Sequence, residues 1–117
     1  MASRSDHVYD MPLSSVYPLY IAKLQRKGRS PEELGQVIGW LTGISSDALC
    51  RHLAEGTTFR AFFETATLNP NASLITGVVC GIRVEDIEDP LMQKIRYLDK
   101  LVDELAKGKA MEKVLRS

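Results

Sequence analysis

The stretch that decides the fold is residues 89–107, DPLMQKIRYLDKLVDELAK. Its apolar residues recur at steps of four, three, four and three positions, which places them on one stripe of an α-helix. These residues are Leu91, Ile95, Leu98, Val102 and Leu105. Asp89 followed by Pro90 is a typical helix start, because Asp caps free N–H groups and proline fits the first helical position. The pattern predicts a long C-terminal helix with one face against a partner.

Upstream of this helix, serine, proline and glycine punctuate further helical patterns. The clearest start is Ser30-Pro31-Glu32-Glu33, where Ser30 caps the helix and Glu33 completes a capping box. The expected helices extend from Ser14 or Ser15 to Gly28, from Pro31 to Gly43, from Ser45 or Ser46 to Gly56, from Thr57 or Thr58 past Phe63, from Ala72 to Cys80, and from Met111 to Leu115. The helix at 72–80 is apolar nearly all round and is therefore expected to be central.

No segment alternates like a β-strand, so the chain is predicted to be all-α, a small orthogonal bundle of six or seven helices. Residues 1–12 are expected to form an N-terminal arm, and residues 13–117 a single domain. Val8, Tyr9 and Met11 are the residues that can attach the arm to the body. Phe59, Phe62 and Phe63, within one turn of each other, are expected to anchor the core; they lie in the fourth of these helices.

Composition narrows the classes of function. The 117 residues include 15 basic and 15 acidic ones, so no long-range field of one sign attracts nucleic acid or an anionic membrane. Cys50 and Cys80 lie in apolar helical patterns without C-x-x-C spacing, which predicts buried free thiols in a reducing compartment. No apolar run reaches the length of a signal peptide core or a membrane span. A cytoplasmic protein is expected.

Several segments carry a family resemblance. They are SSVYPLYIAKLQRKGRS, WLTG, TLNPNASLITGVVCGIRVEDIEDPLMQKIRYLDKL and DELAKGKAMEKVL. With these segments the chain resembles a bacterial domain-of-unknown-function family, number 2200, over nearly all of the sequence after the arm. The resemblance implies a small all-α cytoplasmic protein, and it implies no activity, ligand or catalytic residue.

Residues 30–56 have the spacing of a helix-turn-helix, with small or apolar residues where that motif needs them. These are Ile38, Gly39, Gly43, Ile44 and Leu49. The charge of the segment opposes DNA binding, because it holds one base, Arg51, against four acidic residues. An ordinary helical hairpin is the simpler interpretation, and a DNA-binding protein stays an alternative.

Gly35, Gly39 and Gly43 recur every four residues along one face of the same helix. Glycine inside a helix costs about 1 kcal/mol relative to alanine, so a compensating role is expected. Either another helix of this chain crosses closely there, or the face is a groove for a partner chain or a ligand.

The basic residues near the end of the first helix complement its dipole. They are Lys23, Arg26, Lys27 and Arg29. An alternative is that Arg29, with backbone N–H groups at Ser30, binds an anionic ligand. Two interpretations are also open for Asn69, Asn71 and Thr76. In the simplest one they cap helix ends, and in the alternative they line a polar pocket.

Arg83 is expected to pair with a carboxylate of the acidic run at 85–89, which lacks the spacing of a calcium loop. Cys50 and His52 are two apart on one helix and do not face each other. The pairing of Cys80 with a histidine is left open, so a small enzyme or ligand-binding protein with a pocket near Cys80, Thr76 and Arg83 stays an alternative. We expect no catalytic residue, no metal site and no cofactor.

The sequence therefore favours a binding or interaction module over an enzyme. The stripe of the long helix either packs on this chain or meets a second copy across a two-fold axis, so the expected partners are a second copy or an unknown protein. Nucleic acid and membrane are not expected as partners.

Overall fold

The computed structural model describes residues 9–79 and 81–116, and in this part of the chain the protein is all-α apart from one small hairpin. Its helices and strands follow in chain order: α2 (Leu13–Gln25), α3 (Pro31–Thr42), α4 (Ser46–Glu55), α5 (Phe59–Thr65), the 3-10 helix η1 (Pro70–Leu74), β1 (Val78–Val79), β2 (Ile82–Arg83), the 3-10 helix η2 (Val84–Asp86), α6 (Pro90–Ala106) and α7 (Met111–Val114). The six α-helices of the described residues confirm the predicted fold class.

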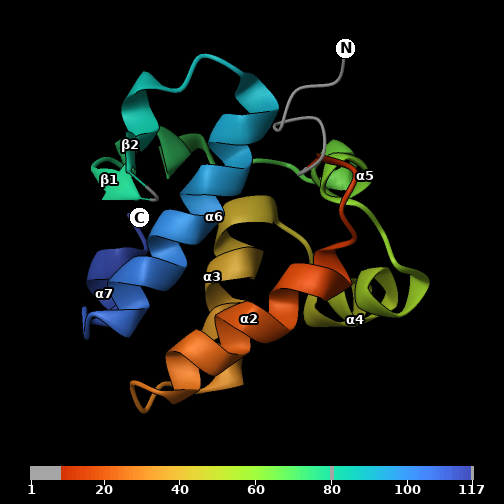
Figure 1. Ribbon diagram of the computed structural model, residues 1–117, viewed down its shortest axis with the longest axis horizontal. Coiled ribbons are helices and arrows are strands. Elements are labelled where there is room, and N and C mark those ends of the chain that lie inside the picture. Colours follow the sequence, from red (N-terminus) through yellow and green to blue (C-terminus); the bar gives the residue numbers. More distant parts are fainter. Residues whose placement is uncertain (1–8, 80, 117) are drawn as a thin grey trace.

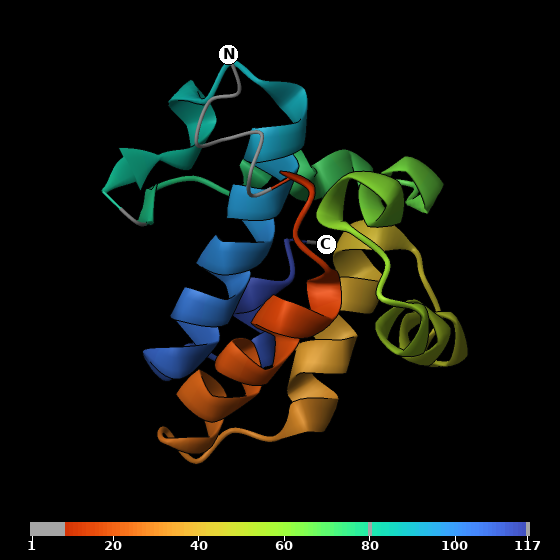
Figure 2. The ribbon, with the colours of Figure 1, turned by 45° about the vertical axis from the view of Figure 1, so that its right-hand side comes forward.

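The long helix α6 is the centre of the molecule, and Figures 1 and 2 show it running through the bundle. It contacts α2, α3, α5, α7 and the hairpin. Ile95, Leu98, Val102 and Leu105 are each at most 2% exposed. Burying one such side chain stabilises the fold by about 1.5–3 kcal/mol, so this stripe is a main source of stability.

The predicted helix boundaries of α3 and α6 are confirmed by their caps. Ser30 accepts a hydrogen bond from the backbone of Glu33, and the Glu33 side chain accepts one from the backbone of Ser30, which completes the capping box. Gly43 ends α3 in the left-handed conformation at φ 69°. Asp89 caps α6 by accepting from two backbone N–H groups of its first turn. The expected start of α2 is wrong, since the helix begins at Leu13 without a side-chain cap.

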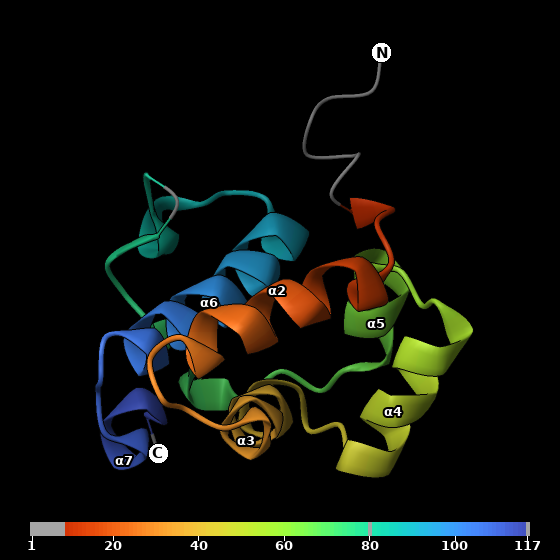
Figure 3. The ribbon, with the colours of Figure 1, turned by 60° about the horizontal axis from the view of Figure 1, so that its bottom comes forward.

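Helices α2, α3, α5 and α7 cover α6 from several sides, and α4 packs on α2. In Figure 3, α2 lies across α6 with α3 beneath it, α4 and α5 lie together at one side, and α7 lies at the other. The aromatic anchor is confirmed, because Phe59, Phe62 and Phe63 are all buried and their rings contact one another.

The helix predicted for residues 72–80 is wrong. Only a 3-10 turn forms at 70–74, and the chain then makes an antiparallel hairpin in which Val78 pairs with Arg83 and Val79 with Ile82. Gly77 has φ 108°, which lies outside the helical region. Glycine tolerates this backbone conformation because it has no Cβ atom. β-branched residues on both sides of it favour extended backbone. The central helix is therefore the amphipathic α6.

The end of the predicted arm is attached to the body. Tyr9 is 4% exposed, and its hydroxyl donates to Asp89 at 2.5 Å. The backbone N–H of Phe59 donates to the carbonyl of Met11 at 3.0 Å. The expected attachment is confirmed for Tyr9 and Met11, whereas Val8 lies outside the described residues.

Candidate functional site

An apolar groove of about 660 Å³ runs between α3 and α4, a size within the range of ligand and peptide sites. Its lining residues are Tyr17 of α2; Pro31, Glu32, Gly35, Gln36, Gly39 and Trp40 of α3; Ile44 and Ser45 of the connection; Ser46, Leu49, Cys50 and Leu53 of α4; and Leu115 after α7. Trp40 is the single tryptophan of the chain and is half-buried there.

Two of the three glycines of the predicted stripe, Gly35 and Gly39, lie in α3 along this groove. A Cβ atom added to Gly35 would meet nothing within 4 Å, and one added to Gly39 would meet only the carbonyl oxygen of Ile44, at 3.6 Å. Gly43 is different, because its positive φ forms the helix end beside Thr67. No helix of the described chain crosses Gly35 closely, so of the two roles predicted for the glycine stripe the groove is the one that fits.

Tyr17 and Cys50 are two of the polar side chains that line the groove. Burial, followed by the nearby Cys50 and Glu32, raises the pKa of the Tyr17 hydroxyl above its ordinary value of 10.0. Cys50 is exposed, so its predicted burial is wrong: the helical pattern places it beside Leu49, but on the groove side of α4 rather than in the core. The sequence indicated a groove only through the glycines of α3, and it did not indicate that Tyr17, Trp40, Cys50 or Leu115 lines it.

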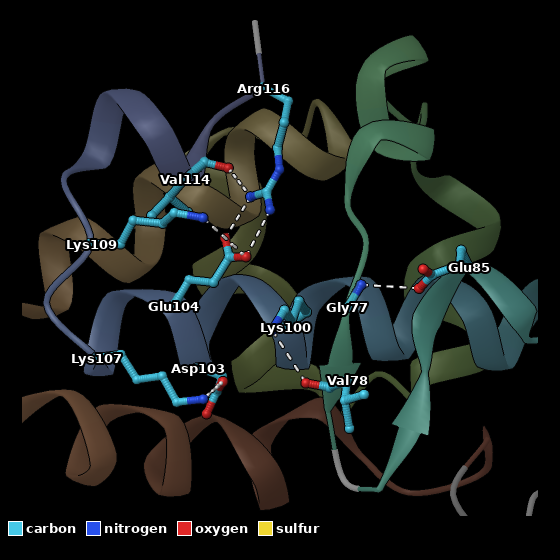
Figure 4. Close-up of polar contacts among 10 residues, drawn as sticks. All are labelled: Gly77, Val78, Glu85, Lys100, Asp103, Glu104, Lys107, Lys109, Val114 and Arg116. Carbon is cyan, nitrogen blue, oxygen red and sulfur yellow. Dashed lines mark hydrogen bonds and ion pairs between the residues drawn. The ribbon is translucent and has the colours of Figure 1, made fainter.

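Leu115 also lines the groove, and an ion pair between the next residue, Arg116, and Glu104 of α6 holds the chain there. Both oxygens of the Glu104 carboxylate accept from the Arg116 guanidinium, at 2.6 and 2.7 Å, and Lys109 lies 3.4 Å away, as Figure 4 shows. Arg116 also donates to the carbonyl of Val114. Burial alone would raise the pKa of Glu104, but Arg116 and the lysines outweigh it and lower that pKa. The chain next to Leu115 is therefore held against α6.

The predicted anion-binding residues are occupied by contacts within the chain. Arg29 pairs with Glu33 at 2.7 Å and donates to the carbonyl of Lys109 at 3.1 Å, while Ser30 belongs to the capping box of α3. Lys23 lies 3.3 Å from Asp103. Anion binding at Arg29 and Ser30 stays a prediction.

The other predicted ligand residues lie outside the groove. Asn69 accepts from the backbone of Asn71 and donates to the carbonyl of Trp40, so it fixes the end of α3. Thr76 is exposed. Arg83 lies on β2, 3.9 Å from Glu85, which confirms its predicted pairing with the acidic run.

Cysteine and metal chemistry gain no support from the described residues. Cys80 and His7 lie outside them. The Nδ1 atom of His52 is 3.0 Å from the Thr57 hydroxyl and its ring contacts Phe62, so it serves the fold. Within residues 9–79 and 81–116, no three His, Cys, Asp or Glu side chains are grouped to hold a metal ion. The same residues form no helix that could span a lipid bilayer.

The predicted interface stripe belongs to the core of its own chain. Ile95, Leu98, Val102 and Leu105 are buried, and Leu91 is partly exposed against the same core. A dimer through this stripe would require the fold to open. Exposed large apolar side chains lie elsewhere, at Leu19, Leu74, Val78 and Ile82.

Comparison with known proteins places the chain in a family. The family described as "Uncharacterized protein conserved in bacteria (DUF2200)" matches residues 7–116. The chain belongs to this family. A solved structure described as "Crystal structure of uncharacterized protein SP1917" has 45% sequence identity and a TM-score of 0.89, covering 97% of this chain and 94% of that chain. No curated protein matches the chain. The DUF2200 match confirms the resemblance found in the sequence and, like it, brings no activity.

Proposed function

We propose that the protein is a binding module whose α3–α4 groove receives an apolar segment of a partner protein. The observation that supports this most strongly is the space above Gly35. A methyl group there would meet no atom and would favour the helix, yet the position leaves the groove open. Proteins give up stability in this way at functional sites.

The lining supports the same proposal. Apolar contact area is offered by the half-buried side chains of Trp40, Ile44, Leu53 and Leu115, and tryptophan is a common anchor of protein interfaces. The α3 side of the groove belongs to a helix that the core holds through Leu34, Val37, Ile38 and Leu41, so this side needs little ordering when a partner binds.

DNA binding by the same two helices is the runner-up. It draws on the helix-turn-helix spacing, with Gly43 at the turn. The acidic excess of residues 30–56 weighs against it, because binding to phosphates requires bases that displace counterions. A duplex that shifts the mobility of the protein with a steep salt dependence would favour this alternative.

A titration that uses Trp40 as the reporter tests the proposal. The ligand is an uncharged amphipathic helical peptide without tryptophan, carrying leucines on one face, and its control is a scrambled peptide of the same composition. We expect a saturable change in Trp40 emission with the amphipathic peptide, and a weaker one with the scrambled peptide. In Gly35→Leu, which fills the groove, the response should be lost. An equal response from the two peptides, or from Gly35→Leu, would overturn the proposal.

A further inference from the structure

The shape of the groove favours a helix as its occupant. Its α3 wall extends from Pro31 to Trp40, nine residues apart, which is about 14 Å at the rise of an α-helix. Anchors at positions i, i+4 and i+7 of a partner helix span about 10 Å and fit along this wall. An extended strand would need free backbone donors and acceptors, but those of helix interiors bond within the helix.

The glycines of the α3 wall permit a close approach between the axis of α3 and the axis of a bound helix. Gly35 and Gly39 lie one turn apart, and their added Cβ atoms would meet nothing or an ordinary contact. Small residues at a crossing place helix axes at the short end of the usual range, about 8 Å. The flanking Trp40 and Leu53 are large, so they can enclose the sides of an inserted helix.

The charged residues around the groove determine which charge is favoured on the flanks of a bound helix. Glu32 is the one charged side chain among the residues that line it. Asp47 follows the lining residue Ser46, and Glu55 ends α4. Because Glu33 is paired with Arg29, the acidic residues of α3 and α4 that stand against their one base, Arg51, are Glu32, Asp47 and Glu55. A partner with basic flanks is therefore attracted, and one with acidic flanks is repelled.

We infer that the occupant is an amphipathic helix of a partner protein, about three turns long, with lysine or arginine flanking its apolar face. This inference rests on the proposed function, since it specifies the partner of the same groove. The apolar face seats over Gly35 and Gly39, and the basic flank lies beside Glu32. Affinity comes from the apolar contact, and the preference among helices comes from the charges.

Three peptides of roughly 16 residues test the inference, a length at which a helix is stable enough to populate. They share the same leucine face and differ only in flanks, which are lysine, glutamate or uncharged glutamine. Binding is measured by Trp40 emission at about 0.05 M and about 0.5 M salt. We expect the lysine peptide to bind about tenfold tighter than the glutamate peptide at low salt, with the difference shrinking at high salt.

Reversing the charge of single acidic residues shows which of them cause the preference for the lysine peptide. Glu32→Lys should reduce the lysine-over-glutamate preference about threefold or more, and Asp47→Lys should act in the same direction. Glu64→Lys makes the same change on α5, outside the groove lining, and should leave the preference near that of the wild type. Circular dichroism confirms that each variant is folded.

The outcomes separate the two proposals. Binding of the uncharged peptide with no preference for lysine refutes the inference but leaves the proposed function standing. No binding of any peptide refutes both. Sedimentation of the free protein as a dimer in which Trp40 is shielded makes a second copy the occupant, which also refutes the inference. If the preference for the lysine peptide is unchanged in Glu32→Lys and Asp47→Lys, the charge effect arises elsewhere, and this result also refutes the inference.

Discussion

Replacing Gly35 by alanine should stabilise the protein, although the glycine lies on the candidate site. The residue is interior to α3 and its φ is helical, so alanine removes backbone entropy from the unfolded chain without strain. The added Cβ meets no atom within 4 Å, so no packing cost opposes this gain. Helix propensity gives a stabilisation of about 0.5–1 kcal/mol. With an unfolding entropy of about 0.25 kcal/mol/K for 117 residues, 1 kcal/mol raises the Tm by roughly 4 °C.

Urea unfolding followed by circular dichroism measures this change, and Gly43→Ala is the matched control on the same helix. Gly43 has φ 69°, and its added Cβ would lie 3.5 Å from the carbonyl oxygen of Thr67, so alanine there should destabilise by about 1 kcal/mol. A Gly35→Ala variant that is less stable than the wild type would refute the reasoning, because it would mean that a closely packed neighbour occupies the groove in solution.

Three further changes test other parts of the structure. Arg116→Met leaves the buried Glu104 carboxylate without its bidentate partner and should cost about 3 kcal/mol at neutral pH, measured by urea unfolding. Because the pKa of Glu104 is lowered in the fold, this stabilisation is full above the ordinary glutamate pKa of about 4.3 and is lost as the pH falls. The free energies of unfolding of the wild type and the variant should therefore converge in acid. A difference between them that stays constant with pH would contradict the reasoning. Leu98→Asp places a charge in the core and should abolish cooperative unfolding. If the wild type were a dimer and the variant a folded monomer, the stripe of α6 would instead belong to an interface. Gly77→Ala should lower the Tm, since φ is 108° and the added Cβ would lie 3.2 Å from the Lys100 side chain; an unchanged Tm would show that the hairpin adapts.

The parts of the fold that follow from local rules could be predicted from the sequence. The capping box at Ser30, the stop at Gly43 and the stripe of α6 each depend on residues within a few positions of one another. The segment 72–80 could not be predicted in the same way. Its apolar residues suit a buried helix or an extended chain equally, and Gly77 at positive φ decides between them.

The candidate site was predictable only in part. The glycine stripe of α3 indicated either a close crossing or a groove, and the choice depended on which helix packs where. Tyr17 and Leu115 reach the groove from opposite ends of the sequence, so no spacing rule connects them to Gly35. Cys50 follows the apolar stripe of α4 closely enough to resemble a core residue, and only the position of α4 exposes it.

The most direct test of the central claim is amide chemical-shift mapping of the uncharged amphipathic peptide on the isotope-labelled protein. We predict that the perturbed amides cluster in residues 31–53, together with Tyr17 and Leu115, which complete the lining of the groove. Shifts that cluster instead around the exposed Leu19 and Ile82, or that spread evenly over the molecule, would contradict the account.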